Sequence, residues 1–128
     1  MPPKSQIHKR ILIVDDEKRV LFVLRKTLER VDAGYEIVTA SDGRAALEAF
    51  ADAPSDLVIT DLRMPGMDGV ALTEAVRRQD SDVVVIWISD FGCRQVQNTA
   101  KRLNVYRCMN KPLEIQEIRE AVRQALQS

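Results

Sequence analysis

The sequence predicts one α/β domain in which helices cover both faces of a five-stranded parallel sheet. Short apolar runs alternate five times with stretches whose apolar residues recur at helical spacing. The chain has 128 residues, enough for one domain with a sizeable core, and no internal repeat or linker divides it. We therefore expect residues 10–128 to form the domain and residues 1–9 to be a flexible tail.

The five apolar runs are the expected strands. They cover residues 10–15, 35–40, 56–61, 83–89 and 105–110. The first, third and fourth runs are almost wholly apolar, which indicates interior strands that are buried on both faces. The second and fifth runs carry polar residues such as Glu36 and Arg107, which suits edge strands. These compositions favour the strand order 2-1-3-4-5 of a flavodoxin-like three-layer sandwich with five helices.

The stretches between the runs are the expected helices. Most of them carry a clear apolar stripe, for example Leu24 with Leu28 and Ile118 with Val122. The fourth stretch is the weakest, because its stripe is interrupted by Asn98, a poor helix former. Low apolar content implies low local stability, so this helix is either a mobile switch element or a poorly packed surface helix.

Composition and charge exclude several classes of protein. The 19 basic and 19 acidic side chains cancel, so the bulk charge does not indicate binding to nucleic acid or to an anionic membrane. The longest apolar run, residues 83–88, is far too short to span a bilayer, and the N-terminus lacks the apolar segment of a secretory signal. We expect a cytoplasmic protein that itself binds neither nucleic acid nor membrane.

The two cysteines, Cys93 and Cys108, form no metal or redox motif at their spacing. We expect reduced thiols in a reducing cytoplasm. Because both are expected near the carboxyl edge of the sheet, a regulatory disulfide is the alternative. Mass analysis after mild oxidation distinguishes the two.

Three carboxylates follow two of the expected interior strands. Asp15 ends the first strand and Asp16 comes directly after it, while Asp61 ends the third strand. Parallel strands bring these residues to one edge of the sheet, where like charges repel in a site of low dielectric constant. A hard divalent cation with oxygen ligands relieves that repulsion, so the sequence predicts a magnesium site.

Ser89 and Lys111 extend this pattern to the ends of the fourth and fifth strands. Alone, a serine after a strand is usually a turn residue, and a lysine is usually a solvated charge. Together with the carboxylates they form a set suited to phosphoryl transfer. A carboxylate is a nucleophile toward phosphorus, magnesium and lysine neutralise phosphoryl oxygens, and a hydroxyl hydrogen-bonds the transferred group.

These residues closely resemble the receiver domain of bacterial two-component response regulators. The matching segments are Ile13 to Glu17, residues 61–69 (DLRMPGMDG), Ile88-Ser89 and Lys111-Pro112. The resemblance extends from about Arg10 to the C-terminus. Haloacid-dehalogenase phosphatases, a rival group with an aspartyl nucleophile, require Asp-x-Asp after the first strand, whereas this chain reads Asp15-Asp16-Glu17.

The resemblance implies a role for each residue of the set. Asp61 would accept a phosphoryl group from a phosphohistidine of a sensor histidine kinase or phosphotransfer protein. Asp16, Asp61 and the backbone carbonyl of Arg63 would ligate Mg²⁺, and Asp15 would hold the ion through water. Lys111 would bind a phosphoryl oxygen.

The resemblance also implies structural and signalling roles. Pro112 would follow a cis peptide bond, and Pro65 and Gly69 would build the turn into the third helix. Ser89 would turn toward phosphorylated Asp61 and pass the signal to the surface of the fourth helix, fifth strand and fifth helix. A homodimer through that surface is a further expectation.

The implied function is a phosphorylation-activated signalling switch. Such a protein catalyses its own phosphorylation and dephosphorylation and is not a turnover enzyme. The alternative is a phosphorylation-independent interaction module that keeps only the fold. Whether this receiver stands alone or belongs to a longer regulator stays open.

Three departures from the family pattern bear on switching. Cys108 stands where the family often has an aromatic residue, and Tyr106 lies two residues earlier on the same strand face. Asn104 replaces the usual glycine after the fourth helix, a conservative change. Asp90 replaces a small residue beside Ser89, and two interpretations are open: a gate in which Asp90 pairs with Arg63 over the site, or a solvated loop aspartate.

Overall fold

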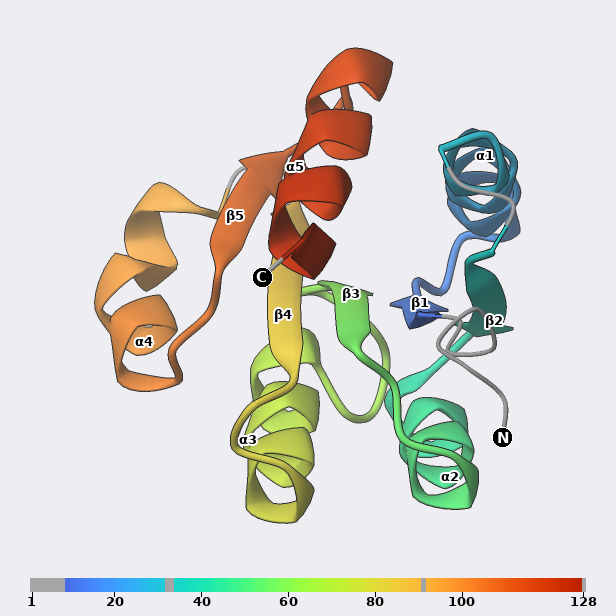
Figure 1. Ribbon diagram of the computed structural model, residues 1–128. Coiled ribbons are helices and arrows are strands. Elements are labelled where there is room, and N and C mark those ends of the chain that lie inside the picture. The colour runs from blue at the N-terminus through green and yellow to red at the C-terminus, as the bar shows by residue number, and fades with distance from the viewer. Residues whose placement is uncertain (1–8, 32–33, 91, 128) are drawn as a thin grey trace.

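A five-stranded parallel sheet forms the centre of the computed structural model, which describes residues 9–31, 34–90 and 92–127 (Figure 1). The strands run in the order β2-β1-β3-β4-β5, which confirms the expected flavodoxin-like topology. Their bounds are β1 Arg10–Val14, β2 Glu36–Ala40, β3 Leu57–Asp61, β4 Val84–Ser89 and β5 Arg107–Asn110. Most of the predicted tail, residues 1–8, lies outside the described residues.

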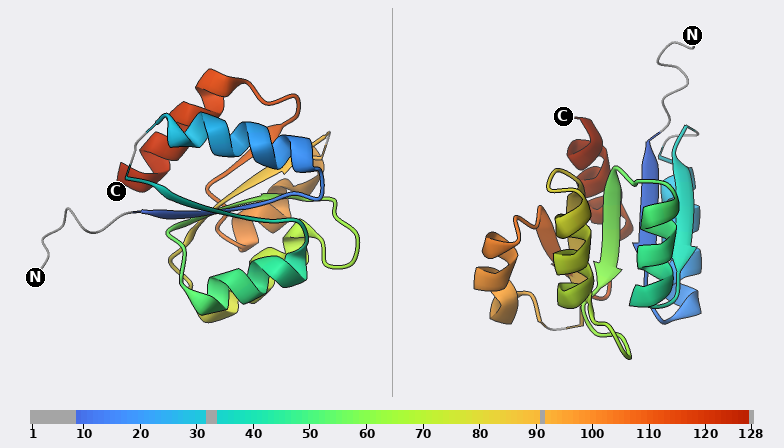
Figure 2. Two further views of the ribbon diagram at one scale, coloured as in Figure 1. Left: turned by 90° about the vertical axis from the view of Figure 1, so that its right-hand side faces the viewer. Right: turned by 90° about the horizontal axis from the view of Figure 1, so that it is seen from below.

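Helices cover the sheet in two layers (Figure 2). Their bounds are α1 Lys18–Glu29, α2 Gly43–Asp52, α3 Gly69–Gln79, α4 Gln97–Arg102 and α5 Ile115–Gln127, with a short 3₁₀ helix, η2 Arg94–Val96, before α4. Helices α1 and α5 pack on one face, and α2, α3 and α4 pack on the other. Among the described residues, no helix is both long and apolar enough to cross a bilayer.

The interior strands supply the core on both faces, as their composition predicts. Leu12 and Val58 face the layer of α2 and α3, whereas Ile13 and Ile59 face α1 and α5. These side chains are almost completely buried, and burying each contributes roughly 1.5–3 kcal/mol. The core therefore fixes β1 beside β3, in a register that pairs Val14 with Thr60. The carboxylates that follow these strands are consequently neighbours.

The fourth helix is short, in agreement with its weak apolar pattern. It has six residues, and none of them is buried. The chain then turns at Asn104, whose φ of 57° lies in the left-handed region that asparagine tolerates. Strand β5 begins at Arg107, two residues later than expected, and Tyr106 remains 47% exposed.

Arg77 of α3 holds this turn in place, a role that the sequence did not indicate. Its guanidinium donates hydrogen bonds to the carbonyl oxygens of Leu103, at 2.9 Å, and Asn104, at 3.0 Å. It also donates to the carbonyls of Ser81 and Val83, just before β4. One side chain thus connects α3 to the segments that enter β4 and β5.

Candidate functional site

Three carboxylates gather where β1 and β3 end. One oxygen from each of Asp15, Asp16 and Asp61 lies within 4.8 Å of the others. Asp15 is fully buried, Asp61 is 6% exposed, and Asp16 is open to solvent. The expected acidic cluster therefore forms, with its exposed member at the mouth.

Backbone pairing carries Asp15 and Asp61 to this edge. The Asp15 N–H donates to the carbonyl of Ala40 in β2, at 3.2 Å. Asp61 is the last residue of β3 and is paired with Ile88 of β4. The Leu62 N–H continues that ladder to the Ile88 carbonyl, at 3.0 Å. Neither carboxylate can leave the edge without disturbing the sheet.

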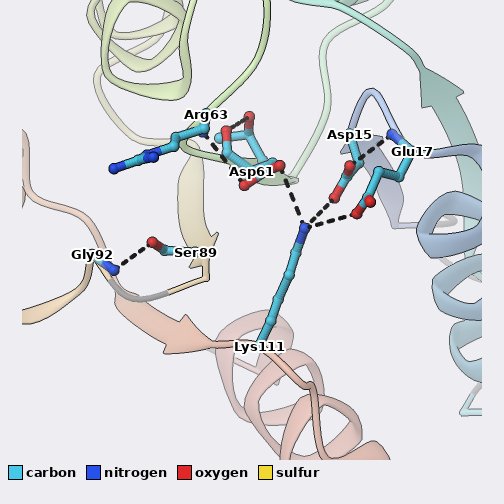
Figure 3. A network of polar contacts seen from close by, with 8 residues as sticks. Asp15, Glu17, Asp61, Arg63, Ser89, Gly92 and Lys111 are labelled. Carbon is cyan, nitrogen blue, oxygen red and sulfur yellow. Dashed lines mark hydrogen bonds and ion pairs between the residues drawn. The ribbon is translucent and has the colours of Figure 1, made fainter.

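Lys111 joins the carboxylates from the loop after β5 (Figure 3). Its Nζ lies 3.3 Å from Asp15 Oδ2 and 3.4 Å from Asp61 Oδ2. It also lies 3.4 Å from Oε1 of Glu17. Glu17 is the residue immediately before α1, and its contact with Lys111 was not predicted because the sequence does not give the direction of an exposed side chain.

Burial and mutual repulsion shape the protonation of these groups. Burial raises the pKa of Asp15 to about 6, against the opposing effect of the Glu17 N–H bond at 2.9 Å, and the nearby Asp61 charge adds to the rise. Burial also raises the pKa of Asp61, although Lys111 opposes it. Burial opposes the charge of Lys111, but Asp15 and Asp61 outweigh that effect and raise its pKa to about 12.

One buried acceptor in the site lacks a hydrogen bond. Asp15 Oδ2 is within ion-pair distance of Lys111, but the two atoms are not aligned for a hydrogen bond. Burying a carboxylate oxygen without a hydrogen bond costs free energy of folding. The potential metal-ligand atoms beside it, from Asp16 and Asp61, are also carboxylate oxygens. This arrangement fits a hard divalent cation such as Mg²⁺.

Gly69 brings the start of α3 against the backbone of the third strand. Its N–H donates to the carbonyl of Leu62, at 3.0 Å. A Cβ atom at this position would collide with the Asp61 carbonyl oxygen and lie 2.9 Å from Leu62 Cα. Pro65 and Gly66, which has a φ of 79°, lie in the same loop and line a hollow beside Asp16. The peptide bond between Lys111 and Pro112 is cis.

The hydroxyl of Ser89 is turned toward the loop that follows β4. Ser89 is buried, and its Oγ accepts a hydrogen bond of 2.7 Å from the N–H of Gly92 (Figure 3). Its carbonyl accepts a bond of 2.7 Å from the Lys111 N–H, which continues the β4–β5 pairing. Ser89 is therefore near the site, but its hydroxyl is held on the loop.

The proposed gate between Arg63 and Asp90 does not form in this structure. Among the described residues, no ion pair within 4.0 Å joins the two, and both side chains are exposed. The Arg63 N–H approaches Asp61 Oδ1 at 3.4 Å, while its side chain extends away from Lys111 (Figure 3). A solvated loop aspartate is the interpretation that agrees with these contacts.

The expectation of reduced thiols is wrong for this structure, because Cys93 and Cys108 form a disulfide. Their Cα atoms are 5.6 Å apart, although 15 positions separate them in sequence. The spacing of the two cysteines in the sequence did not indicate the bond, because the bond depends on how the β4–α4 loop brings Cys93 to β5.

Comparison with known proteins gives consistent matches. A family model described as the response regulator receiver domain matches residues 11–123. Sporulation initiation phosphotransferase F of Bacillus subtilis is 31% identical over 120 residues, which cover 94% of this chain and 95% of that protein. The regulatory protein AtoC of Escherichia coli is 36% identical over 92% of this chain, but the match covers only 25% of AtoC.

Solved structures agree with the sequence matches. Chemotaxis protein CheY4 of Vibrio cholerae has a TM-score of 0.85 at 27% identity, covering 93% of this chain and 99% of that chain. Response regulator protein TrrA of Thermotoga maritima, in complex with Mg(2+)-BeF, has a TM-score of 0.81 at 31% identity. That match covers 92% of this chain and 99% of the TrrA chain.

The close approach at Gly69 gives the first prediction. Gly69→Ala should lower the free energy of unfolding by roughly 1–3 kcal/mol, because the added methyl group must displace the backbone of β3. Gly43→Ala is the comparison variant, because it also begins a helix after an aspartate cap. Its methyl group would lie 2.7 Å from Cβ of Met67, in the loop before α3, so a shift of that loop relieves the contact, whereas at Gly69 the backbone of the site itself must move. Urea denaturation of both variants measures the difference. An equal loss in both would contradict the role given to Gly69.

The buried Asp15 gives a second prediction, on pH. Because its folded pKa, about 6, exceeds the ordinary 3.8, the folded chain holds the proton more tightly than the unfolded chain. The metal-free protein therefore loses stability from this group as pH rises between those values. Asp15→Asn should be more stable than wild type by roughly 1–3 kcal/mol near pH 7, with the difference vanishing below about pH 4.

Urea denaturation across this pH range, in the presence of a chelator, measures the effect. Added Mg²⁺ should then stabilise wild type and not Asp15→Asn. A stability difference that is the same at every pH would show that burial of the charge is not its cause.

Proposed function

The chain belongs to the response regulator receiver domain family, and on that premise we propose that it is a signalling switch activated by phosphorylation of Asp61. The observation that carries this proposal is the position of Lys111 Nζ, within 3.4 Å of both Asp15 and Asp61. A cation held between two carboxylates at a sheet edge suits the binding of an incoming phosphoryl group. A purely structural lysine would gain little from this half-buried position.

In the proposed reaction, an oxygen of Asp61 attacks the phosphorus of a phosphohistidine. The new O–P bond forms as the P–N bond breaks, and the imidazole, which carries a proton on its other ring nitrogen, leaves as neutral histidine. Lys111 attracts the phosphoryl oxygens and keeps its proton, since its pKa is about 12. Asp16, Asp61 and the Arg63 carbonyl, with Asp15 through water, are the groups that would hold Mg²⁺. When bound, Mg²⁺ would supply positive charge against the phosphoryl oxygens.

Ser89 is the proposed responding group. Its hydroxyl would leave the Gly92 N–H and turn toward the phosphoryl group on Asp61, so that the β4–α4 loop moves with it. The surface of α4, β5 and α5 would carry the signal outward. Its use for a homodimer stays a prediction.

The proposed partner is a sensor histidine kinase or a phosphotransfer protein. Relatives carry the names of both classes: a phosphotransferase, matched over nearly its whole length, and sensor protein GacS of Pseudomonas syringae, of which the match covers 14%. We further propose that the chain catalyses only its own phosphorylation and dephosphorylation. A cytoplasmic location stays a prediction.

Labelling with acetyl phosphate tests the proposal and gives a third prediction. With Mg²⁺, the wild-type protein should gain the mass of one phosphoryl group, and chelation of the metal should abolish the gain. Asp61→Asn should lose the label because the nucleophile is gone. Asp68→Asn is the matched control, because Asp68 is a nearby exposed carboxylate whose cap on α3 asparagine preserves.

Intact-mass spectrometry of the three proteins reads out the result. A labelled Asp61→Asn variant would contradict the assignment of the phosphoacceptor. No label on folded wild type, with no response to beryllofluoride, would favour the phosphorylation-independent interaction module.

A further inference from the structure

The disulfide connects the loop after the phosphorylation site to the edge strand. Cys93 lies just before η2 in the β4–α4 loop, and Cys108 lies in β5, where it is the register partner of Trp87. Both half-buried cysteines lie on the α4 side of the sheet, where Cys108 packs with the core that Val96 and Ala100 join. The bond therefore joins the loop that would move in the proposed switch to a strand of the sheet.

The tethered loop is the segment that holds Ser89. The N–H of Gly92, next to Cys93, donates the 2.7 Å bond to Ser89 Oγ. The carbonyl of Gly92 also accepts bonds from the N–H groups of Gln95, at 3.1 Å, and Val96, at 3.2 Å, which begin η2. A restraint on Cys93 thus restrains both the Ser89 hydroxyl and the start of the segment leading to α4.

The disulfide is open to attack. Cys93 and Cys108 line a surface hollow together with Arg94, Lys101 and the polar side chain of Asn110. The attacking species in thiol–disulfide exchange is an anionic thiolate, which cationic side chains attract. The setting therefore suits reduction by a small thiol or by an exposed cysteine of another protein.

We propose that Cys93 and Cys108 form a reversible thiol–disulfide site that controls whether Ser89 responds to phosphorylation of Asp61. This inference rests on the proposed function. In the oxidised form the tether keeps the Ser89 hydroxyl on the Gly92 N–H, so that α4 does not respond. Reduction frees the loop, and Ser89 then moves toward the phosphoryl group.

The redox step is ordinary disulfide exchange. A thiolate attacks one sulfur of the pair, the Cys93–Cys108 bond breaks, and the other cysteine leaves as a thiolate that takes up a proton. A second thiol attacks the mixed disulfide and releases the second cysteine. Two electrons and two protons thus pass from two external thiols, which become a disulfide. A disulfide oxidant reverses the sequence.

Nuclear magnetic resonance with Mg²⁺ and beryllofluoride as the probe tests this proposal. We expect the amides of Leu62 and Arg63 to shift in both the oxidised and the phosphine-reduced protein, which reports occupation of the site. On addition of the probe, the amide resonances of Gly92 and of residues 97–102 should shift in the reduced protein. The same resonances should not shift in the oxidised protein. The double variant Cys93→Ser with Cys108→Ser should respond as the reduced protein does, with or without phosphine.

The other possible outcomes contradict the redox control, the phosphorylation proposal or the disulfide site separately. Equal shifts of Gly92 and α4 in both redox forms would overturn the redox control and leave the phosphorylation proposal standing. No shift at Leu62 and Arg63 in either form would overturn both. Two free thiols after mild oxidation, measured by alkylation and mass, would overturn the disulfide site. Loss of helical circular dichroism on reduction would show a structural bond instead of a switch.

Discussion

The crowding of Asp15, Asp16 and Asp61 at one edge of the sheet, with Lys111 paired to Asp15 and Asp61, is the interaction on which the rest of this structure depends. Burial of Asp15, with an oxygen that lacks a hydrogen bond, makes the carboxylate unfavourable as an anion, and its raised pKa follows from that burial. Lys111 relieves part of the repulsion, but its single positive charge does not offset the negative charges of three carboxylates. The site therefore favours a further positive charge such as a divalent cation, and a bound cation would in turn offset the negative charge of an incoming phosphoryl group.

The fold tolerates this unfavourable cluster because the strands beneath it are fixed by apolar packing. Side chains on both faces of β1 and β3 are almost wholly buried, so the two strands hold their carboxyl ends together despite the repulsion. Gly69 and Arg77 support the site through the backbone and not through its charges. One lets α3 approach the Asp61 backbone, and the other holds the segments that lead into β4 and β5. Stability elsewhere thus supports a site that is itself destabilising.

Composition and order along the chain were enough to predict the sheet and the acidic cluster, because buried strands and strand-end carboxylates leave a local pattern. The short α4 was predictable for the same reason, because the low apolar content of its segment is also a local pattern. What escaped prediction depends on side-chain direction and on the path of loops. The Glu17 contact with Lys111 and the bonds made by Arg77 join residues that are distant in sequence. The disulfide between Cys93 and Cys108 was only the alternative to reduced thiols, because it depends on the path of the loop that carries Cys93. Of the two interpretations of Asp90, the solvated loop aspartate agrees with the contacts in this structure, and the gate with Arg63 stays a prediction.

The carboxyl titration of Asp15, followed by nuclear magnetic resonance with and without Mg²⁺, tests the central claim most directly. The account predicts a pKa near 6 in the metal-free protein and a marked fall when Mg²⁺ is added, because the cation favours the anionic form. A pKa near the ordinary 3.8 that does not respond to Mg²⁺ would contradict it. In that case neither repulsion nor burial at this edge would explain metal binding.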